Sequence, residues 1–317
     1  MKQTAIIIVN WNGWKDTKEC LESFDMPLTD AHFFIVDNAS TDDSLSHLEA
    51  YFMTKAISYC ICTDRTLAVA CDLSQKITLI ANRHNQGFAG ANNLVLKFLL
   101  PRQDFSRAWM LNNDTIVTGD SLRELHKAMD TYERTAFCGS VILDYNQPEL
   151  IQCCGVNHYA YLGISKLYLK NKKWNSVKNV IALEQARQHY QNGASLLVDL
   201  SSLREIGLMD EMFFLYSEEA DWQLRAAKFR FENRLAWKSI IYHKGSMSTA
   251  GKKHLFFFNY NRSAILLTRK NFSRLAALTA TLSLCIITAV RARLNIKSLA
   301  AGIRGIVTGW RTRIVKP

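Results

Sequence analysis

The sequence predicts an α/β fold with a single, mostly parallel sheet covered by helices on both faces. Short apolar runs rich in β-branched residues, typical of strands buried on both faces, occur at 5–9, 32–36, 77–80 and 108–111. Each run is followed by a stretch with the apolar spacing of a helix, at about 14–24, 42–52, 87–100 and 120–132. Strands that alternate with helices in this way form parallel sheets.

The later elements are less regular. Residues 193–229 read as a strand, a helix, a loop and a second helix that begins around 219–221, and residues 235–245 read as a last strand ending at His243. Residues 53–76 contain three cysteines and have no clear period, so we expect an insertion at the domain edge.

Composition sets limits on the function. With 48% apolar and 21% charged residues, the chain is an ordinary globular protein. Residues 252–317 contain 13 Lys and Arg and no Asp or Glu, so this tail carries the whole of the +11 formal charge. The tail interleaves its charges with apolar runs and has no recognition motif, which argues against a nucleic-acid partner. The opening apolar run, Ala5–Val9, is too short for an export signal, so we expect a cytoplasmic protein.

The eight cysteines contain no pair of CxxC motifs and do not have the spacing of a zinc site. Cys60 with Cys62, and Cys153 with Cys154, leave metal binding or a redox pair open. Buried free thiols are the preferred interpretation.

Polar residues follow three successive strands at the point where each ends. They are Asn10 and Asn12, then Asp37 and Asn38, then Asn112, Asn113 and Asp114. Any one group could be a turn, because Asn and Asp bond to nearby backbone. Three groups at equivalent positions favour a ligand site, since ligands bind at this edge of open α/β sheets.

Six segments in order resemble the motifs of the family 2 glycosyltransferases: "IIIVNWNG", "IVDNASTDDS", "NQGFAGANN", "LNNDT", "SEEADWQLR" and "IIYHKG". The resemblance runs from about residue 4 to 265 and is strongest to the rhamnosyltransferase-like enzymes of bacterial surface polysaccharide assembly. It implies one Rossmann-like nucleotide-sugar domain of the GT-A type.

The resemblance also implies roles for ten residues. Asp114 stands at the metal position, where it would bind Mg²⁺ or Mn²⁺ together with His243, although the first acid of the family pattern is replaced by Asn112. Glu219 stands where the family has its catalytic base. The residues implied in binding the nucleotide sugar are Asn10, Asp37, Asn85, Gly87, Asn92, Asn112 and Asn113.

Structural interpretations of the same residues remain open. A histidine at the end of a strand is often structural, and acids such as Glu218 and Glu219 are favoured at any helix N-terminus by the helix dipole. If the base motif is shifted by one residue, Glu218 takes the role of Glu219.

The predicted function is an inverting, metal-dependent glycosyltransferase that uses a nucleotide-diphosphate sugar, with dTDP-rhamnose as the preferred donor. A polyprenyl-linked saccharide is the expected acceptor. The alternative is a nucleotide-sugar-binding regulatory module without turnover.

We expect a catalytic domain at 1–265 and a basic, amphipathic membrane-association region at 266–317. The run 275–290 has no charge but is short for a spanning helix. Beyond it, Ile296, Leu299, Ile303 and Ile306 recur at helical spacing among cations, which predicts a helix lying on an anionic membrane surface. The protein would then be peripheral on the inner face of the cell membrane.

Overall fold

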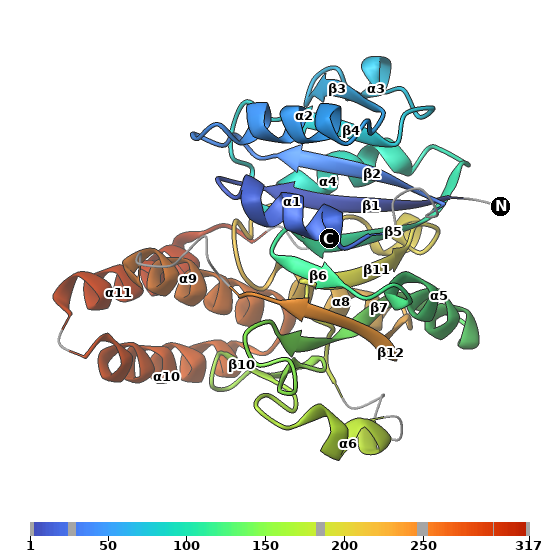
Figure 1. Cartoon of the computed structure of the whole chain (residues 1–317). Coiled ribbons are helices and arrows are strands. Elements are labelled where there is room, and N and C mark those ends of the chain that lie inside the picture. Colours follow the sequence, from blue (N-terminus) through green and yellow to red (C-terminus); the bar gives the residue numbers. More distant parts are fainter. Residues whose placement is uncertain (1–2, 25–29, 182–187, 246–252, 294, 315–317) are drawn as a thin grey trace.

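A mixed sheet forms the centre of the computed structural model, which describes residues 3–24, 30–181, 188–245, 253–293 and 295–314. In these residues the sheet has ten strands (Figure 1). They are β1 (Gln3–Asn10), β2 (Ala31–Asp37), β3 (Tyr59–Thr63), β4 (Ile77–Ala81), β5 (Phe105–Asn112), β6 (Thr115–Val117), β7 (Thr135–Asp144), β8 (Ile151–Cys153), β11 (Ser195–Asp199) and β12 (Glu232–His243).

The strand order is β3-β4-β2-β1-β5-β11-β7-β12-β6, with β8 paired to β7. Strands β3, β4, β2, β1 and β5 run parallel, whereas β11 is antiparallel to both of its neighbours and β6 is antiparallel to β12. The predicted α/β class with a mostly parallel sheet is confirmed.

The register of the parallel strands brings their polar ends together. Asn10 pairs with Asp37, and Val9 pairs with Asn112. The three polar groups identified from the sequence therefore lie side by side at the carboxyl edge of the sheet.

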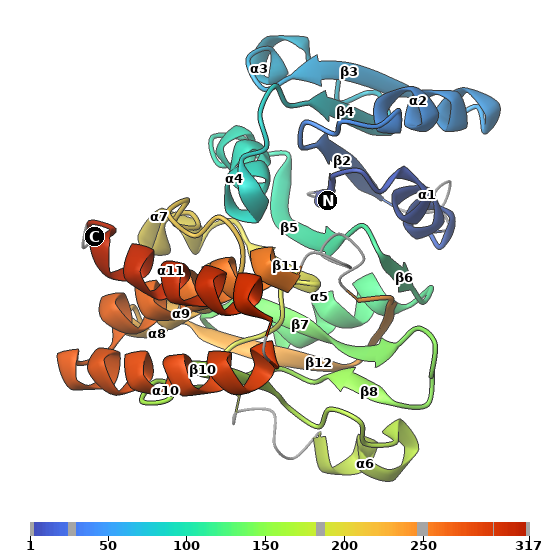
Figure 2. The same ribbon diagram turned by 90° about the vertical axis from the view of Figure 1, so that its left-hand side faces the viewer.

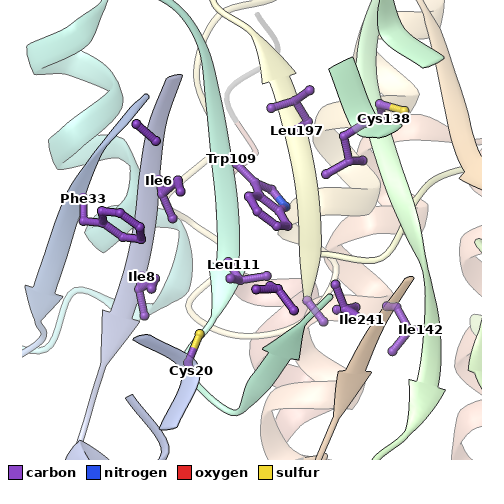
Figure 3. Close-up of a cluster of buried hydrophobic side chains, with 14 of the residues drawn as sticks. Ile6, Ile8, Cys20, Phe33, Trp109, Leu111, Cys138, Ile142, Leu197 and Ile241 are labelled. Carbon is purple, nitrogen blue, oxygen red and sulfur yellow. The ribbon is translucent and has the colours of Figure 1, made fainter. Parts of the chain in front are cut away.

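Both faces of the sheet are covered by helices. Helices α1 (Trp14–Glu22), α2 (Ser44–Thr54) and α5 (Ser121–Thr131) pack on one face, against Ile6, Phe33 and Trp109 (Figure 3). Helices α4 (Gly87–Leu99), α7 (Leu203–Ile206) and α8 (Glu218–Lys228) pack on the other. Since successive side chains of a strand point to opposite faces, both cores are apolar and the strands appear as continuous apolar runs.

Residues 53–76 differ from the predicted insertion. They contain the end of α2, the strand β3 and the short helix α3 (Leu67–Ala70), and β3 pairs in parallel with β4 along its whole length. This segment is thus the edge of the main sheet. Its strand lacks an apolar run because an edge strand is buried less than a central one, and Ile61 is 46% exposed.

The eight cysteines are free thiols, and the predicted burial holds for five of them; Cys60, Cys71 and Cys285 are only partly buried. Burial raises the pKa of the Cys20, Cys138 and Cys153 thiols to about 12, so these groups are protonated at neutral pH.

The C-terminal part forms three helices at one side of the sheet: α9 (Lys253–Asn271), α10 (Arg274–Ala292) and α11 (Ile296–Arg311) (Figure 2). A hairpin of β9 (Val156–Tyr159) and β10 (Ile164–Leu167) lies next to α10, and α6 (Trp174–Ile181) is peripheral. The predicted domain boundary after residue 265 falls inside α9, which is one continuous helix.

Helix α11 does not present its whole apolar pattern to the outside. Ile306 is only 4% exposed, because it packs against Ile265 of α9 and Leu284 of α10. The expectation that Ile306 faces a membrane is therefore wrong. Gly302, Gly305 and Gly309 let α11 pack this closely, since a Cβ at Gly305 would lie 2.3 Å from the Phe258 carbonyl oxygen of α9.

Candidate active site

A cavity of about 810 Å³ opens at the carboxyl ends of β1, β2 and β5 and is closed by the loop before α8. Seven of the ten predicted site residues line it: Asn85, Gly87, Asn112, Asn113, Asp114, Glu219 and His243. The motifs that carry these residues are far apart in sequence, and the fold brings them to one place.

Asp114 and His243 form a close pair in this cavity. Asp114 lies in the turn between β5 and β6, and His243 ends β12, which pairs with β6 so that Thr115 lies opposite His243. As a result, Nε2 of His243 is 3.0 Å from Oδ1 of Asp114. Nδ2 of Asn112 lies 3.4 Å from the same histidine nitrogen.

Gln152 on β8 determines which nitrogen of His243 faces the cavity. Its Nε2 donates to the His243 carbonyl oxygen at 3.3 Å, which leaves Oε1 as the atom 2.6 Å from Nδ1. An amide oxygen only accepts, so Nδ1 carries the proton. In the neutral ring Nε2 then presents a lone pair toward Asp114.

This arrangement fits a divalent cation. A carboxylate and an imidazole lone pair 3.0 Å apart repel each other unless a proton or a cation lies with them. The described residues contain no cluster of three or more His, Cys, Asp or Glu side chains suited to a metal. Two protein ligands supplemented by phosphate oxygens and water are normal for Mg²⁺, and Mn²⁺ accepts the same oxygen donors.

The turn at residues 85–88 and the loop before α8 shape another part of the cavity wall. Asn85 Oδ1 accepts from the Gly87 amide at 2.9 Å and from Asn38 Nδ2 at 3.0 Å. Gly87 has a φ of +69°, and a Cβ there would lie 2.3 Å from the Phe214 carbonyl oxygen. Only glycine allows the 85–88 turn to meet the loop before α8 this closely.

Asn113 connects the turn between β5 and β6, which carries Asp114, to the start of α1. Its Nδ2 donates to the Gly13 carbonyl oxygen at 3.2 Å and lies 3.1 Å from the Thr17 hydroxyl. The side chain thus lines the cavity and also fixes its floor.

Three predicted residues do not line the cavity. Asn10 is fully buried and donates to Asp37 at 2.7 Å, while Asp37 also accepts from the Ser40 hydroxyl and amide. These two residues hold the loop after β2 in place. Asn92 is buried in α4, where its amide donates to the Phe88 carbonyl oxygen at 2.9 Å.

Glu218 and Glu219 begin α8 at the opposite wall. The chain enters this helix through Tyr216 and Ser217, whose φ values of 70° and 69° are unusual for residues with a side chain. Both residues are among those that line the cavity. Such strained backbone is frequent at functional sites, where the surrounding fold maintains it.

Burial shifts both acids in the same direction. It raises the pKa of the Glu219 carboxyl above its usual value. Burial and the charge of Glu219 raise the pKa of Glu218 well above its usual value, and none of the residues that the structure describes forms a hydrogen bond with Oε2 of Glu218. Burial thus favours the neutral form of Glu218, and Glu219, which is the less deeply buried of the two, is the better candidate for the base.

The sequence did not indicate every residue of the site. Asn12 and Asn38 line the cavity and were visible in the strand-end groups, but no role was assigned to them. Gln152 gave no signal, because it is a single polar residue between the buried Ile151 and Cys153.

Residues 5–152 match the family model described as "Glycosyl transferase family 2". No curated protein matches the chain in sequence. Three solved structures resemble it at low identity, so they show the fold alone.

The mannosyltransferase PcManGT from Pyrobaculum calidifontis, in complex with GDP-Man and Mn²⁺, is 11% identical with a TM-score of 0.58, and the match covers 98% of this chain and 86% of that one. GalNAc-T7 with UDP, GalNAc and Mn²⁺ is 11% identical with a TM-score of 0.63, and the match covers 98% of this chain and 56% of that one. TarS 1–349 from S. aureus in complex with UDP is 12% identical with a TM-score of 0.50, covering 93% and 74%. The solved structures show that the chain has a GT-A-like fold, and the family model adds a likeness to glycosyl transferase family 2 over residues 5–152, which is less than half of the chain.

Proposed function

We propose that the protein is an inverting, metal-dependent glycosyltransferase that moves a sugar from a nucleoside-diphosphate donor to a lipid-linked saccharide. One observation carries the proposal: the Asp114–His243 pair and Glu219 line the same cavity at the carboxyl edge of the sheet. A volume of about 810 Å³ is within the range of ligand sites.

Asp114 and Nε2 of His243 would hold the Mg²⁺ or Mn²⁺ ion. When bound, the ion would neutralise the charge that develops on the departing diphosphate. Two of the fold's neighbours are described with Mn²⁺ and a nucleotide or nucleotide sugar, which agrees with this assignment. Gln152 orients His243 so that its free nitrogen points to the ion.

Glu219 would act as the general base. The acceptor hydroxyl oxygen forms a bond to the anomeric carbon while the bond from that carbon to the diphosphate oxygen breaks, and the hydroxyl proton passes to Glu219. A single displacement of this kind inverts the anomeric centre. A carboxylate whose pKa is raised by burial is a stronger base than an exposed one, which suits this step.

The proposed donor is dTDP-rhamnose, followed by UDP sugars, and the proposed acceptor is a polyprenyl-linked saccharide of cell-surface polysaccharide synthesis. Both follow from the motif resemblance and not from contacts in the cavity. The proposed location is the cytoplasmic face of the cell membrane, where such acceptors are reached. The basic C-terminal region agrees with it.

A panel of nucleotide sugars tests the proposal. With Mn²⁺ or Mg²⁺ and a polyprenyl-linked saccharide, we expect nucleoside-diphosphate release and a product heavier by one sugar in mass spectrometry. Asp114→Ala should abolish sugar transfer while the protein stays folded. Removal of the metal ion by a chelator should abolish the transfer activity of the intact protein. Full activity in excess EDTA would contradict the metal role, and donor binding without turnover for every sugar would favour the regulatory module.

A further inference from the structure

Helix α10 exposes several large apolar side chains to the outside and buries mostly small ones. An ordinary surface helix does the opposite. Five of the large apolar side chains of α10 form one exposed stripe, here called the α10 stripe, with exposed fractions between 53% and 71%. The stripe consists of Leu275, Leu278, Leu282, Ile286 and Val290. A surface helix normally turns such residues to the core, and a contiguous apolar patch on the outside marks an interaction site.

The inward side of α10 consists mostly of small residues, together with Leu284, and is attached to α9 and α11 by hydrogen bonds. Its buried residues include Ala276, Ala277 and Ala280. Asn261 of α9 donates to the Thr288 hydroxyl at 2.8 Å, and the Trp310 indole of α11 donates to the Thr281 hydroxyl at 2.9 Å. The stripe is therefore presented by a helix that is fixed to the rest of the protein, and α10 lies on the outside of the helical layer in both views (Figures 1 and 2).

The β9–β10 hairpin adds aromatic side chains beside this helix. Gly163 lies against α10, where a Cβ would be 3.0 Å from Ala280 and 3.1 Å from Leu284. Tyr159, Tyr161 and Leu162, in the same hairpin, are 44%, 58% and 45% exposed. Tyrosine has an apolar ring with a polar end, which suits it to the boundary between hydrocarbon and water.

Charge decides between the candidate occupants of the stripe. Arg274 lies at one end of α10, Arg291 and Arg293 lie at the other, and all three are exposed. No acidic residue occurs anywhere in 252–317. A second copy packed antiparallel on the stripe would bring Arg274 next to the partner's Arg291 with no carboxylate from this region between them.

We propose that the α10 stripe docks this protein on a bilayer that contains anionic lipid, with the helix lying flat in the interfacial layer. The large apolar residues enter the acyl boundary, and the cations at both ends of α10 bind lipid phosphates and anionic head groups. This replaces the sequence-based expectation that α11 is the main membrane-facing helix.

The orientation follows from the attachment of α10. Within the described residues, α10 is the one helix that is long and apolar enough to cross a membrane, with a mean hydropathy of 1.8 over its most apolar window. Crossing would require it to leave α9 and α11 and to break the hydrogen bonds of Thr281 and Thr288 inside hydrocarbon. Lying flat keeps these bonds and inserts only the stripe, which is about 22 Å long.

Docking through α10 would place the cavity close to the lipid surface. Helix α9, which carries α10, holds the loop that closes the cavity: the Ser263 hydroxyl donates to the Leu215 carbonyl oxygen at 2.8 Å, and the Tyr260 ring packs edge-on against Tyr216. A polyprenyl-linked acceptor would thus reach the cavity without leaving the membrane. This last step rests on the proposed function, whereas the docking surface does not.

Co-sedimentation of the full chain with vesicles tests the proposal. The vesicles consist of phosphatidylcholine with one third phosphatidylglycerol. Comparison with vesicles of phosphatidylcholine alone measures how much the anionic lipid contributes to binding. The test variant is Leu278→Gln with Leu282→Gln and Ile286→Gln. The matched control is Met53→Gln with Val69→Gln, which alters exposed apolar residues at the other side of the molecule.

We expect the triple variant to lose at least about a hundredfold in vesicle affinity, because three inserted side chains no longer contribute burial of apolar area. The control should bind as the intact chain does, and phosphatidylcholine alone should bind more weakly. An unchanged Tm shows that the triple variant is folded. Donor binding, measured separately, reports on the proposed function, so failure of one idea does not imply failure of the other.

Three results would overturn the proposal. The first is equal sedimentation of the triple variant and the intact chain. The second is that the intact chain does not bind vesicles but forms a dimer in solution, while the triple variant is a monomer. This result would show that the stripe binds a second copy of the chain. The third is resistance to alkaline extraction from membranes, which would show a spanning helix in place of a flat one.

Discussion

Gln152 is not among the residues that line the cavity, yet its hydrogen bonds to His243 determine which nitrogen of that ring faces the cavity. Its side-chain amide forms two hydrogen bonds with His243, one to the carbonyl oxygen and one to Nδ1. A histidine ligand held in this way has a fixed ring orientation and a free Nε2, and such supporting hydrogen bonds tune metal affinity.

We therefore predict that Gln152→Leu weakens Mn²⁺ binding by about 10–100-fold while the fold persists. The measurement is Mn²⁺ titration followed by electron paramagnetic resonance, with nucleoside diphosphate present and no turnover required. Gln147→Leu, at an exposed position in the preceding turn, is the control. Equal Mn²⁺ affinity in the two variants would show that Gln152 is only structural.

Glu219→Gln keeps the shape of the side chain but cannot accept a proton. We expect turnover to fall by about 10²–10⁴-fold with donor affinity nearly unchanged. Steady-state kinetics and a donor-binding isotherm measure the two quantities. A harmless Glu219→Gln combined with a severe Glu218→Gln would assign the base to the neighbouring residue.

Glu218 gives a prediction about stability and pH. Its pKa is raised by burial, so the folded state holds its proton more tightly than the unfolded chain, where the pKa is about 4.3. The folded state is thus favoured fully below that value and loses stability as the pH rises toward the raised folded pKa. Replacing Glu218 by Gln removes this dependence.

The expected result is a higher Tm for Glu218→Gln than for the intact chain at pH 8, with the difference vanishing near pH 4. Thermal melts across this range measure it. A Tm difference that is the same at every pH would mean that folding does not shift the pKa of Glu218, contrary to the burial of its Oε2 without a partner among the described residues.

What the sequence predicts at this scale follows from position along strands. Asp114, Asn112 and His243 stand directly after or at the end of apolar runs, and the register of parallel strands places such residues at one edge. Asn92 stands within a helix, where sequence spacing does not say which way a side chain points, and it bonds to its own helix. Gln152 acts across 91 residues of sequence, a contact that local pattern cannot reveal.

At the scale of elements, the central strands and their helices were predictable because burial on both faces leaves continuous apolar runs. The edge strand β3 and the packing of α11 were not. In α11 the apolar period was visible, but the meaning of Gly302, Gly305 and Gly309 depends on whether another helix approaches them. Here α9 does, and the glycine face is the buried one.

The close contact between Gly305 of α11 and α9 predicts that a glycine-to-alanine substitution, which normally stabilises a helix, is destabilising at this position. Alanine in place of glycine in an exposed helix is stabilising by up to about 1 kcal/mol. At Gly305 the new Cβ would lie 2.3 Å from a backbone oxygen of α9, so the helices must separate. We expect Gly305→Ala to destabilise the protein by about 1–3 kcal/mol.

Urea denaturation measures this free energy. Ala300→Gly, at an exposed position of α11, is the control for intrinsic helix preference and should cost about 1 kcal/mol or less. A gain in stability for Gly305→Ala would show that α11 does not pack closely on α9 in solution.

At the scale of the molecule, the C-terminal helices belong to the same folded unit as the cavity. The sequence suggested a separate region from 266 because charge and composition change there. The structure shows instead that α9 packs along α8, the helix that carries Glu218 and Glu219, and is joined to it by buried polar groups. Composition reports the change in surface chemistry and not the boundary of a core.

Lys270 of α9 is the centre of this junction and gives the last prediction. Its ammonium group is 2.8 Å from Asp221 of α8 and 2.6 Å from Asp210, and Asp221 is completely buried. Lys270→Ala would leave Asp221 without its main counter-charge, and removing one partner of a buried pair costs about 3–5 kcal/mol. The exposed pair Lys97–Glu211 is the control, since Lys97→Ala should cost less than about 1 kcal/mol of unfolding free energy.

Urea denaturation measures whether the sheet and the C-terminal helices unfold together. A tryptophan signal reports on the sheet, and a label on α11 reports on the helices. One shared transition, shifted strongly by Lys270→Ala, is expected if the helices that would dock on the membrane and the site of chemistry fold as one body. Two separate transitions, with the sheet unaffected by Lys270→Ala, would show that the C-terminal helices are an independent module.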